Sequence, residues 1–275
     1  MKSVLTIAGS DSGGGAGIQA DLKTFQELNV FGTSVITAIT AQNTQHVYSI
    51  QAIDINIIAD QLKAVLNDFD ICAIKTGMLY SKDIIRTISS ILKTTNKPLI
   101  VDPVMVSKSK ATLLDIHAIE EFKQNILPMA YLITPNIPEA EVLSNMKINS
   151  KQDIQNIANR LIEKGVKNVL IKGGHLHHDE FAEDYLLNDN KIFYLRTPRV
   201  NTSDTHGTGC TLSAAITALL ADGYALLDAV IEAKKFIQMA IENPIHLGHG
   251  HGPINHFAYH KITPKVQIEV QTYGH

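Results

Sequence analysis

The amino-acid sequence predicts an α/β fold, in which a mostly parallel central sheet carries helices on both faces and a small antiparallel edge. Short β-branched apolar runs recur along the first two thirds of the chain, and each ends at a polar or glycine-rich turn. Segments with the apolar period of a helix separate these runs. Strands that are apolar on both sides and are joined through helices form parallel sheets that are covered on both faces.

The predicted elements follow one another along the chain. The predicted strands share a buried, β-branched composition and lie at residues 4–8, 34–39, 71–74, 99–101, 131–133 and 169–171. The helical period predicts amphipathic helices at residues 18–28, 58–69 and 154–162. Two further helices are predicted at residues 211–221 and 226–242, because Asp222-Gly223 between them is a helix stop signal.

A change of pattern after these strands predicts the antiparallel edge. Two extended runs between Asp184 and Arg196 flank the turn sequence Asn188-Asp189-Asn190, which is typical of a hairpin. We expect this hairpin at the edge of the sheet. The chain has no Pro/Gly/Ser-rich linker, no low-complexity segment and no fixed repeat, which predicts one domain over residues 1–275.

Composition restricts the classes of protein to consider. The 275 residues are 45% hydrophobic and 19% charged, which indicates a globular chain with a large core and excludes disordered and fibrous classes. A formal net charge of −3 without a basic block argues against nucleic acid as the main partner.

The sequence also predicts the compartment of the protein. The apolar start of the chain meets Gly9 and Asp11 too early for an export signal, and no apolar run reaches membrane-spanning length. Two cysteines do not make a disulfide scaffold, so we expect a cytoplasmic protein.

The first predicted strand leads into a glycine-rich loop at residues 9–17, and a helix follows at once. Glycines allow a ligand to approach the backbone closely, and free N–H groups at a helix start attract anions or polar rings. The loop lacks the Gly-Lys-Ser/Thr end of a Walker A motif and the glycine spacing of a dinucleotide fingerprint. A ligand-binding loop and a purely structural tight turn both remain open.

A second glycine loop, residues 201–210, leads into a helix of small residues. The amides of Gly207, Thr208 and Gly209 at the positive end of a helix dipole predict an anion hole for a transferring phosphoryl group. Cys210 lies at the helix start, where a thiol pKa is commonly depressed from about 8.5, so that it could act as a base. The alternative is a buried cysteine without chemistry, which is our interpretation of Cys72 in its apolar strand.

A series of motifs along residues 4–257 resembles one enzyme family. The motifs lie at residues 8–21, 40–44, 75–79, 102–105, 134–140, 171–175 and 205–210. In this order they resemble the hydroxymethylpyrimidine and phosphomethylpyrimidine kinases of thiamine biosynthesis, within the ribokinase-like superfamily. The resemblance implies an enzyme that uses ATP to phosphorylate hydroxymethylpyrimidine and then its monophosphate. A pyridoxal or pyridoxine kinase is the near alternative, and a non-catalytic pyrimidine-binding protein is the alternative from another class.

The resemblance also implies a pocket for the pyrimidine ring. In similar kinases the residue matching Gln42 hydrogen-bonds the aminopyrimidine edge, and the residues matching Gly9, Met78 and Val104 line the ring pocket. Apolar walls with a few directional polar groups suit a planar heteroaromatic ring. Asp21 is implied to add a polar contact to the substrate, with an ordinary aspartate on the helix surface as the alternative.

For phosphoryl transfer, the resemblance implies that Asp102 and Glu139 are Mg²⁺ ligands that Asn136 helps to position. Without the family, a strand-end aspartate is equally a cap or turn former. Lys172 is implied to contact the nucleotide, with a solvated lysine as the alternative. Lys108 could neutralise the phosphate of the second substrate, although a polar loop is equally plausible there.

The last implied roles concern the second glycine loop and the end of the chain. Thr208 would contact the nucleotide, and Cys210 would be the base in place of the aspartate of many ribokinase-like enzymes. The Gly-His-rich segment 248–252 is implied to be a loop beside the nucleotide end, with a metal site as the alternative. Similar kinases are commonly homodimers, which the sequence itself does not test.

Overall fold

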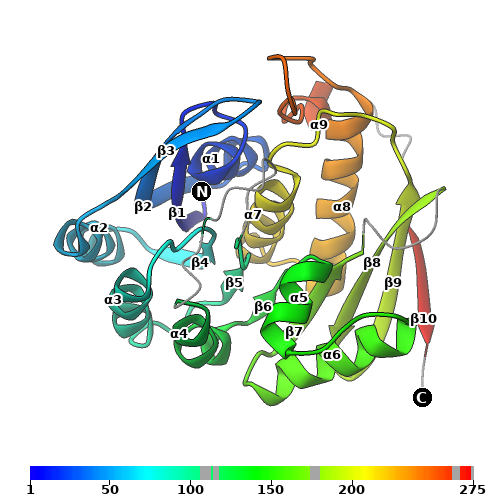
Figure 1. Cartoon of the computed structure of the whole chain (residues 1–275), viewed down its shortest axis with the longest axis horizontal. Helices are drawn as coiled ribbons and strands as arrows, with labels where there is room; N and C mark the ends of the chain where they lie inside the picture. The colour runs from blue at the N-terminus through cyan, green and yellow to red at the C-terminus, as the bar shows by residue number, and fades with distance from the viewer. Residues whose placement is uncertain (106–112, 114–117, 174–179, 262–266, 274–275) are drawn as a thin grey trace.

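The computed structural model describes residues 1–105, 113, 118–173, 180–261 and 267–273. Within these residues ten strands form one sheet in the order β10-β9-β8-β7-β6-β5-β4-β1-β2-β3 (Figure 1). The strands are β1 Ser3–Asp11, β2 Phe31–Gln42, β3 Val47–Ala52, β4 Ile71–Thr76, β5 Leu99–Val101, β6 Leu132–Ile133, β7 Asn168–Lys172, β8 Phe181–Asn188, β9 Lys191–Pro198 and β10 Glu269–Tyr273. The helices are α1 Gly17–Glu27, α2 Ile55–Asp68, α3 Lys82–Leu92, α4 Ala118–Asn125, α5 Ile137–Ser144, α6 Lys151–Glu163, α7 Thr208–Ala221, α8 Leu226–Glu242 and α9 Ala258–Lys261.

The centre of the sheet is parallel and its margins are antiparallel. Every pair from β2 through β1, β4, β5 and β6 to β7 is parallel. The pairs β2–β3, β7–β8, β8–β9 and β9–β10 are antiparallel. The predicted fold class is therefore confirmed, with each predicted strand at its place in the chain.

The predicted hairpin is β8–β9, but it is not at the edge of the sheet. Its turn residues Asp189 and Asn190 have φ of 49° and 60°, the left-handed pair that a two-residue hairpin turn needs. The edge strand is β10, which pairs with β9. Its sequence, Glu-Val-Gln-Thr-Tyr, is short and lacks a clear apolar face, so the pattern gave no signal for it.

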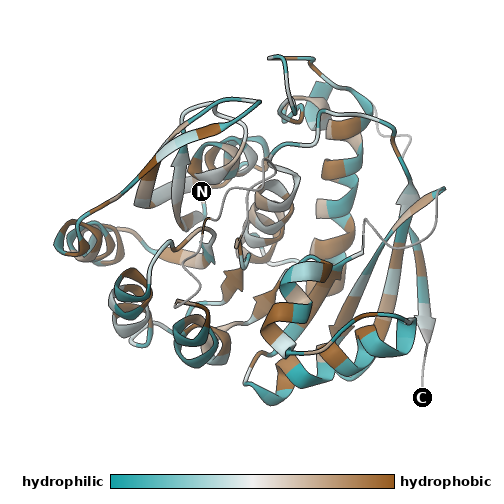
Figure 2. Cartoon of the chain, viewed as in Figure 1, coloured by the Kyte–Doolittle hydropathy of each residue, from teal (hydrophilic) through white to brown (hydrophobic). Residues whose placement is uncertain are grey.

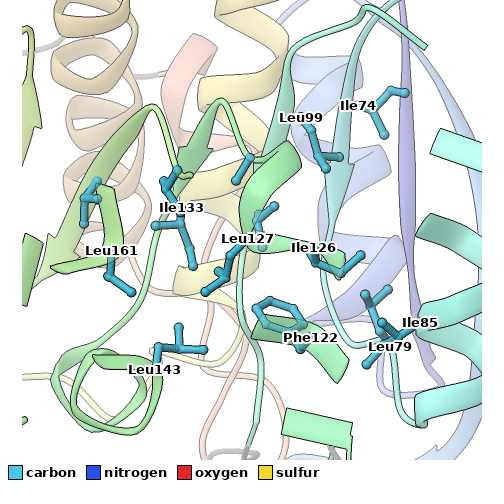
Figure 3. Packing of buried hydrophobic residues seen from close by; sticks show 14 of the residues in the cluster. Ile74, Leu79, Ile85, Leu99, Phe122, Ile126, Leu127, Ile133, Leu143 and Leu161 are labelled. Atoms are coloured by element: carbon cyan, nitrogen blue, oxygen red, sulfur yellow. The ribbon is translucent and has the colours of Figure 1, made fainter. Parts of the chain in front are cut away.

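Two hydrophobic layers enclose the sheet, one on each face. In β5, Leu99 and Val101 join the core beneath α2 to α6, while Ile100 between them joins the core beneath α1, α7 and α8. The first core also contains Phe122 and Leu127, packed close together (Figure 3). Figure 2 shows brown, apolar residues along the central strands and teal residues on the outer sides of the helices. Among the described residues, no helix combines the length and apolar character that a membrane crossing requires.

The topology determines where a ligand site lies. Parallel strands end at one edge of the sheet, and ligands of such sheets bind beyond the carboxyl ends of the strands. The glycine loop after β1, the segments after β4, β5 and β6, and the end of β7 therefore meet at one edge.

Candidate functional site

A single carboxylate, that of Asp11, organises the first glycine loop. It accepts hydrogen bonds from the backbone N–H groups of Gly13 (2.8 Å), Gly15 (3.1 Å) and Ala16 (2.9 Å). Burial works to raise the pKa of Asp11, but the contacts with His206 and the backbone amides outweigh it, so the pKa is lowered. Asp11 was not among the predicted site residues, although its place among glycines after a strand was a usable signal.

The two glycine loops contact each other directly. His206 Nε2 lies 2.8 Å from Asp11 Oδ2, which joins the loops through side chains. Gly207 has a φ of 86°, and a Cβ on it would lie 1.8 Å from the carbonyl oxygen of Gly15. Only glycine fits this left-handed, crowded position. The loops predicted separately thus form one site.

Cys210 lies where these loops meet. It belongs to the first turn of α7, and the backbone amide of Gly17, at the start of α1, works to lower the pKa of its thiol. The expected depression of its pKa is wrong. Burial raises the pKa of Cys210 to about 11, because the loss of solvent and the nearby carboxylates of Asp21 and Asp102 outweigh the ammonium of Lys75. The thiol is therefore protonated at neutral pH.

The predicted anion hole is only partly available. The N–H of Thr208 donates to the carbonyl oxygen of Thr205 at 3.3 Å, and the Thr208 hydroxyl donates to the same oxygen at 3.1 Å. The amides of Gly209 and Cys210 are in the first helical turn, where N–H groups have no partner one turn earlier in the helix. These two amides are the better candidates for holding a phosphoryl oxygen.

Asp21 has a different role from the one the resemblance implied. Its side chain is fully buried, and its two oxygens lie 2.7 and 2.8 Å from Lys75 Nζ. The Thr6 hydroxyl donates to it as well, at 2.6 Å. Asp21 is thus neither an exposed aspartate nor open to a ligand, and it holds Lys75 beneath the site. Sequence reasoning gave Lys75 no role, although it is the first residue of the motif at residues 75–79.

Asp102, Glu139 and Lys172 form the charged centre at the strand ends. Lys172 Nζ lies 2.9 Å from Asp102 Oδ1, and a Cβ on Gly209 would lie 3.2 Å from the same nitrogen. Lys172 is therefore beside the second glycine loop (residues 201–210, hereafter the phosphate loop) and is no solvated turn lysine. Burial raises the pKa of Glu139 to about 7, with Lys172 opposing the shift and Asp102 adding to it.

The donor set at this centre fits a divalent cation. Mg²⁺ is usually held by one or two carboxylates together with phosphate oxygens and water. Asp102 and Glu139 are two buried carboxylates beside one ammonium, that of Lys172, so the centre has a net negative charge when both carboxylates are ionised. Among the described residues, no group of three or more acidic, histidine or cysteine side chains is placed to hold a metal. Asn136 positions Glu139 as expected, through reciprocal hydrogen bonds of 2.9 and 2.8 Å that cap α5.

The predicted ring-pocket residues come from several neighbouring strands. A Cβ on Gly9 would lie 2.4 Å from Met78 Cε, so these two residues are in contact. Gln42, at the end of β2, and Val104, after β5, are half-buried. Their contact with a ring stays a prediction. Lys108 lies outside the described residues.

The Gly-His-rich segment lies against the turn between β2 and β3. The N–H of His251 donates to the carbonyl oxygen of Thr44 at 2.8 Å, and the amides of His249 and Gly250 donate to the Thr44 hydroxyl at 3.2 and 3.1 Å. A cavity of about 290 Å³ lies here, lined by Gly13, Asn43, Thr44, Gln45, Leu247, Gly248, His249 and Pro253. The segment thus borders the first glycine loop, on the side of Gln42.

Known proteins resemble this chain over almost its whole length. The family model described as phosphomethylpyrimidine kinase matches residues 11–255. A hydroxymethylpyrimidine/phosphomethylpyrimidine kinase of Haemophilus influenzae is 52% identical over 95% of this chain and 99% of its own length. The protein of that name from Bacillus subtilis is 45% identical over 94% of this chain and 96% of its own length.

Solved structures agree with these relatives. A pyridoxal kinase from Staphylococcus aureus in complex with pyridoxal has a TM-score of 0.91 at 36% identity, covering 99% of both chains. The phosphomethylpyrimidine kinase of Clostridium difficile has a TM-score of 0.78 at 45% identity, covering 88% of this chain and all of that one. The Staphylococcus aureus kinase is also known in complex with ADP. The chain therefore belongs to the hydroxymethylpyrimidine/phosphomethylpyrimidine kinases, a family of ribokinase-like phosphotransferases.

Proposed function

We propose that this chain uses ATP to phosphorylate the hydroxymethyl group of 4-amino-5-hydroxymethyl-2-methylpyrimidine, and then phosphorylates the monophosphate to the diphosphate for thiamine biosynthesis. The observation that carries the proposal is the meeting of the two glycine loops, where Gly207 lies against Gly15 and His206 contacts Asp11, a few residues before Cys210. It brings a thiol from the phosphate loop to the mouth of the loop implied to hold the ring. Lys172 and Asp102 lie beside the same phosphate loop, at Gly209.

In the proposed reaction, the hydroxymethyl oxygen attacks the γ-phosphorus of ATP, and the bond from that phosphorus to the β,γ-bridging oxygen breaks. The thiolate form of Cys210 receives the proton of the hydroxyl and becomes the thiol, and ADP leaves with the bridging oxygen. The amides of Gly209 and Cys210 hold the charge on the transferring phosphoryl group, and Lys172 neutralises charge at the nucleotide. Asp102 and Glu139 would hold Mg²⁺, which supplies charge neutralisation on the triphosphate when bound.

The raised pKa of Cys210 restricts how it can act. A thiol with a pKa of about 11 is rarely ionised at neutral pH, but its thiolate is a stronger base than an ordinary cysteine thiolate. Lys75 is the nearby cation that favours the ionised form. The proposal therefore requires the rate to follow the thiolate fraction.

The choice of ring has two candidates, each with its own support. Relatives at 52% and 45% identity carry the pyrimidine name. The pyridoxal kinase of Staphylococcus aureus is similar in structure over 99% of the chain, at a TM-score of 0.91. Gln42 and Met78 favour the pyrimidine, because a side-chain amide can pair with the amino group and ring nitrogen of its edge.

A competition assay separates these candidates. Both rings are offered together with ATP, and kcat/KM is determined for each from its own product. The proposal predicts at least tenfold preference for the hydroxymethylpyrimidine. A preference for pyridoxal would replace it with the near alternative, and no ATP consumption with either ring would indicate a binding protein without turnover.

The remaining features of the proposal concern setting and assembly. Small molecules are the proposed partners, and neither nucleic acid nor a membrane is part of the proposed function. We place the enzyme in the cytoplasm as a homodimer whose subunits are single kinase domains. Mass measurement in solution at micromolar concentration tests the dimer, and a monomer that turns over at full rate would contradict it.

A further inference from the structure

His206 stands between the two glycine loops and is unused by the proposed reaction. His206 is 9% exposed, and it directly precedes Gly207 in the phosphate loop. Its backbone is fixed on both sides, since its N–H donates to the carbonyl oxygen of Gly252 at 3.0 Å and its carbonyl oxygen accepts from the N–H of Ile254 at 3.3 Å. The contact of the imidazole with Asp11 therefore joins a firmly held end of the phosphate loop to the first glycine loop.

The imidazole has two neighbours at one nitrogen. Nε2 lies 2.8 Å from Asp11 Oδ2 and 3.3 Å from Gln42 Nε2. A ring nitrogen either donates or accepts, so it can satisfy only one of these groups. An ionised carboxylate can only accept, and the lowered pKa of Asp11 keeps it ionised. The proton of the imidazole therefore sits on Nε2 and is donated to Asp11.

This assignment has a consequence for Gln42. Within the described residues, His206 is the one group within hydrogen-bond distance of the Gln42 amide nitrogen. With Nε2 protonated, the Gln42 NH₂ group finds no acceptor there and stays free for a ligand. The backbone of Gln42 is meanwhile fastened to the first loop, because its N–H donates to the Ser12 hydroxyl and its carbonyl oxygen accepts from it, both at 2.7 Å.

We propose that Asp11 and His206 are positioning residues that clamp the first glycine loop to the phosphate loop, with the proton on His206 Nε2. The clamp sets where Cys210 and the amides of the phosphate loop lie relative to the bound ring. It also leaves the Gln42 amide free for that ring. The predicted effect of the clamp on turnover rests on the proposed function. The predicted position of the proton on His206 does not depend on that function.

The matched variants are His206→Leu and His206→Gln. Leucine removes the donor, whereas the amide nitrogen of glutamine reaches about as far as Nε2 and can still donate to Asp11. A misplacement of about 1 Å costs on the order of a hundredfold in rate. We expect kcat to fall about a hundredfold in His206→Leu with KM for the pyrimidine changed less than threefold, and His206→Gln to recover kcat to within about fivefold of wild type.

A second aspartate–histidine pair supplies the control. Asp204 is in the same loop and is 5% exposed, and it lies 2.8 Å from Nδ1 of His246, whose side chain is 75% exposed. His246→Gln, at the exposed member of this pair, should leave kcat within about twofold of wild type. A fall in His246→Gln equal to that in His206→Leu, or a His206→Gln variant as slow as the leucine variant, would overturn the clamp.

A spectroscopic measurement tests the clamp without any turnover. Two-bond ¹H–¹⁵N correlation on wild-type protein labelled with ¹⁵N-histidine reports which ring nitrogen carries the proton. We expect Nε2 of His206 to be protonated at pH 7.5. An unprotonated Nε2 in the wild type would overturn the inference even where the leucine variant fails to fold. A wild type without kinase activity but with protonated Nε2 would refute the proposed function and leave the clamp intact.

Discussion

Two lysine–aspartate pairs lie beneath the same site, and they differ in burial and in charge balance. Lys75 and Asp21 are 2.7 Å apart with both side chains 0% exposed. Lys172 and Asp102 are 2.9 Å apart, but the Lys172 side chain is 17% exposed and Glu139 adds a second carboxylate. The first pair is a closed unit of one cation and one anion, supported by Thr6. The second has excess negative charge and an opening. The same residue types therefore serve structure in one place and ligand binding in the other.

The largest effect should come from breaking the closed pair. Burial works to lower the pKa of Lys75 and raises the pKa of Asp21. The Asp21 carboxylate outweighs burial at Lys75, whose pKa is raised, and the 2.7 Å contact favours the charged pair. Lys75→Met leaves a fully buried carboxylate with the Thr6 hydroxyl but without its cation, and we expect a loss of about 3–5 kcal/mol in the free energy of unfolding. Urea denaturation measures it. The double variant Lys75→Met/Asp21→Leu should recover most of the loss, and a single-variant loss below about 1 kcal/mol would show that the pair is not the closed unit described.

The open pair should respond in catalysis more than in stability. Lys172→Met removes the cation beside the phosphate loop, and we expect kcat/KM to fall about 10²–10³-fold, which corresponds to about 3–4 kcal/mol of transition-state stabilisation. Its loss in unfolding free energy should be smaller than that of Lys75→Met, because the side chain is already partly solvated. Steady-state kinetics and urea denaturation on the same preparations give both values. The reverse pattern, in which Lys172→Met unfolds the protein but leaves kcat/KM of the folded fraction unchanged, would show that the open pair is structural, like the closed pair.

A smaller effect should appear in the pH dependence of stability. The pKa of Glu139 is about 7 in the folded chain, above its usual 4.5, so the folded state holds this proton more tightly than the unfolded state. Its contribution to stability is therefore largest at acid pH and is lost as pH rises from 4.5 through 7. We expect the stability difference between wild type and Glu139→Gln to change by about 2–3 kcal/mol between pH 5 and pH 8, in the direction that weakens the wild type. A stability difference that is the same at pH 5 and pH 8 would show that burial does not raise the pKa of Glu139.

The fold was largely predictable because buried parallel strands leave a strong local signal. The runs ending at Ala8, Val101 and Ile133 are apolar on both sides, and each is a strand in the structure. Strands β3 and β10 were missed because both are short and mostly exposed, so pairing with a neighbour rather than their own pattern makes them strands. Helices α3, α4 and α5 were missed as well.

The site was predictable in its loops but not in its electrostatics. The residues of both glycine loops were found because turns and helix starts have local signatures. That Asp21 pairs with Lys75 and that Asp11 meets His206 depends on contacts 54 and 195 residues apart in sequence. The prediction of a lowered pKa for Cys210 failed for the same reason. Burial by elements distant in sequence raises this pKa more than the local helix start lowers it.

The central claim is that Cys210 accepts the substrate proton at the meeting point of the two loops. The most direct measurement is kcat/KM for the pyrimidine against pH, for wild type beside Cys210→Ala, with nucleotide affinity measured on both. Because the thiol pKa is about 11, the wild-type value should rise close to tenfold per pH unit from pH 7 to pH 10. The alanine variant should be slower by orders of magnitude, should lack this rise, and should bind nucleotide nearly as wild type does. An alanine variant with near wild-type turnover would contradict the account.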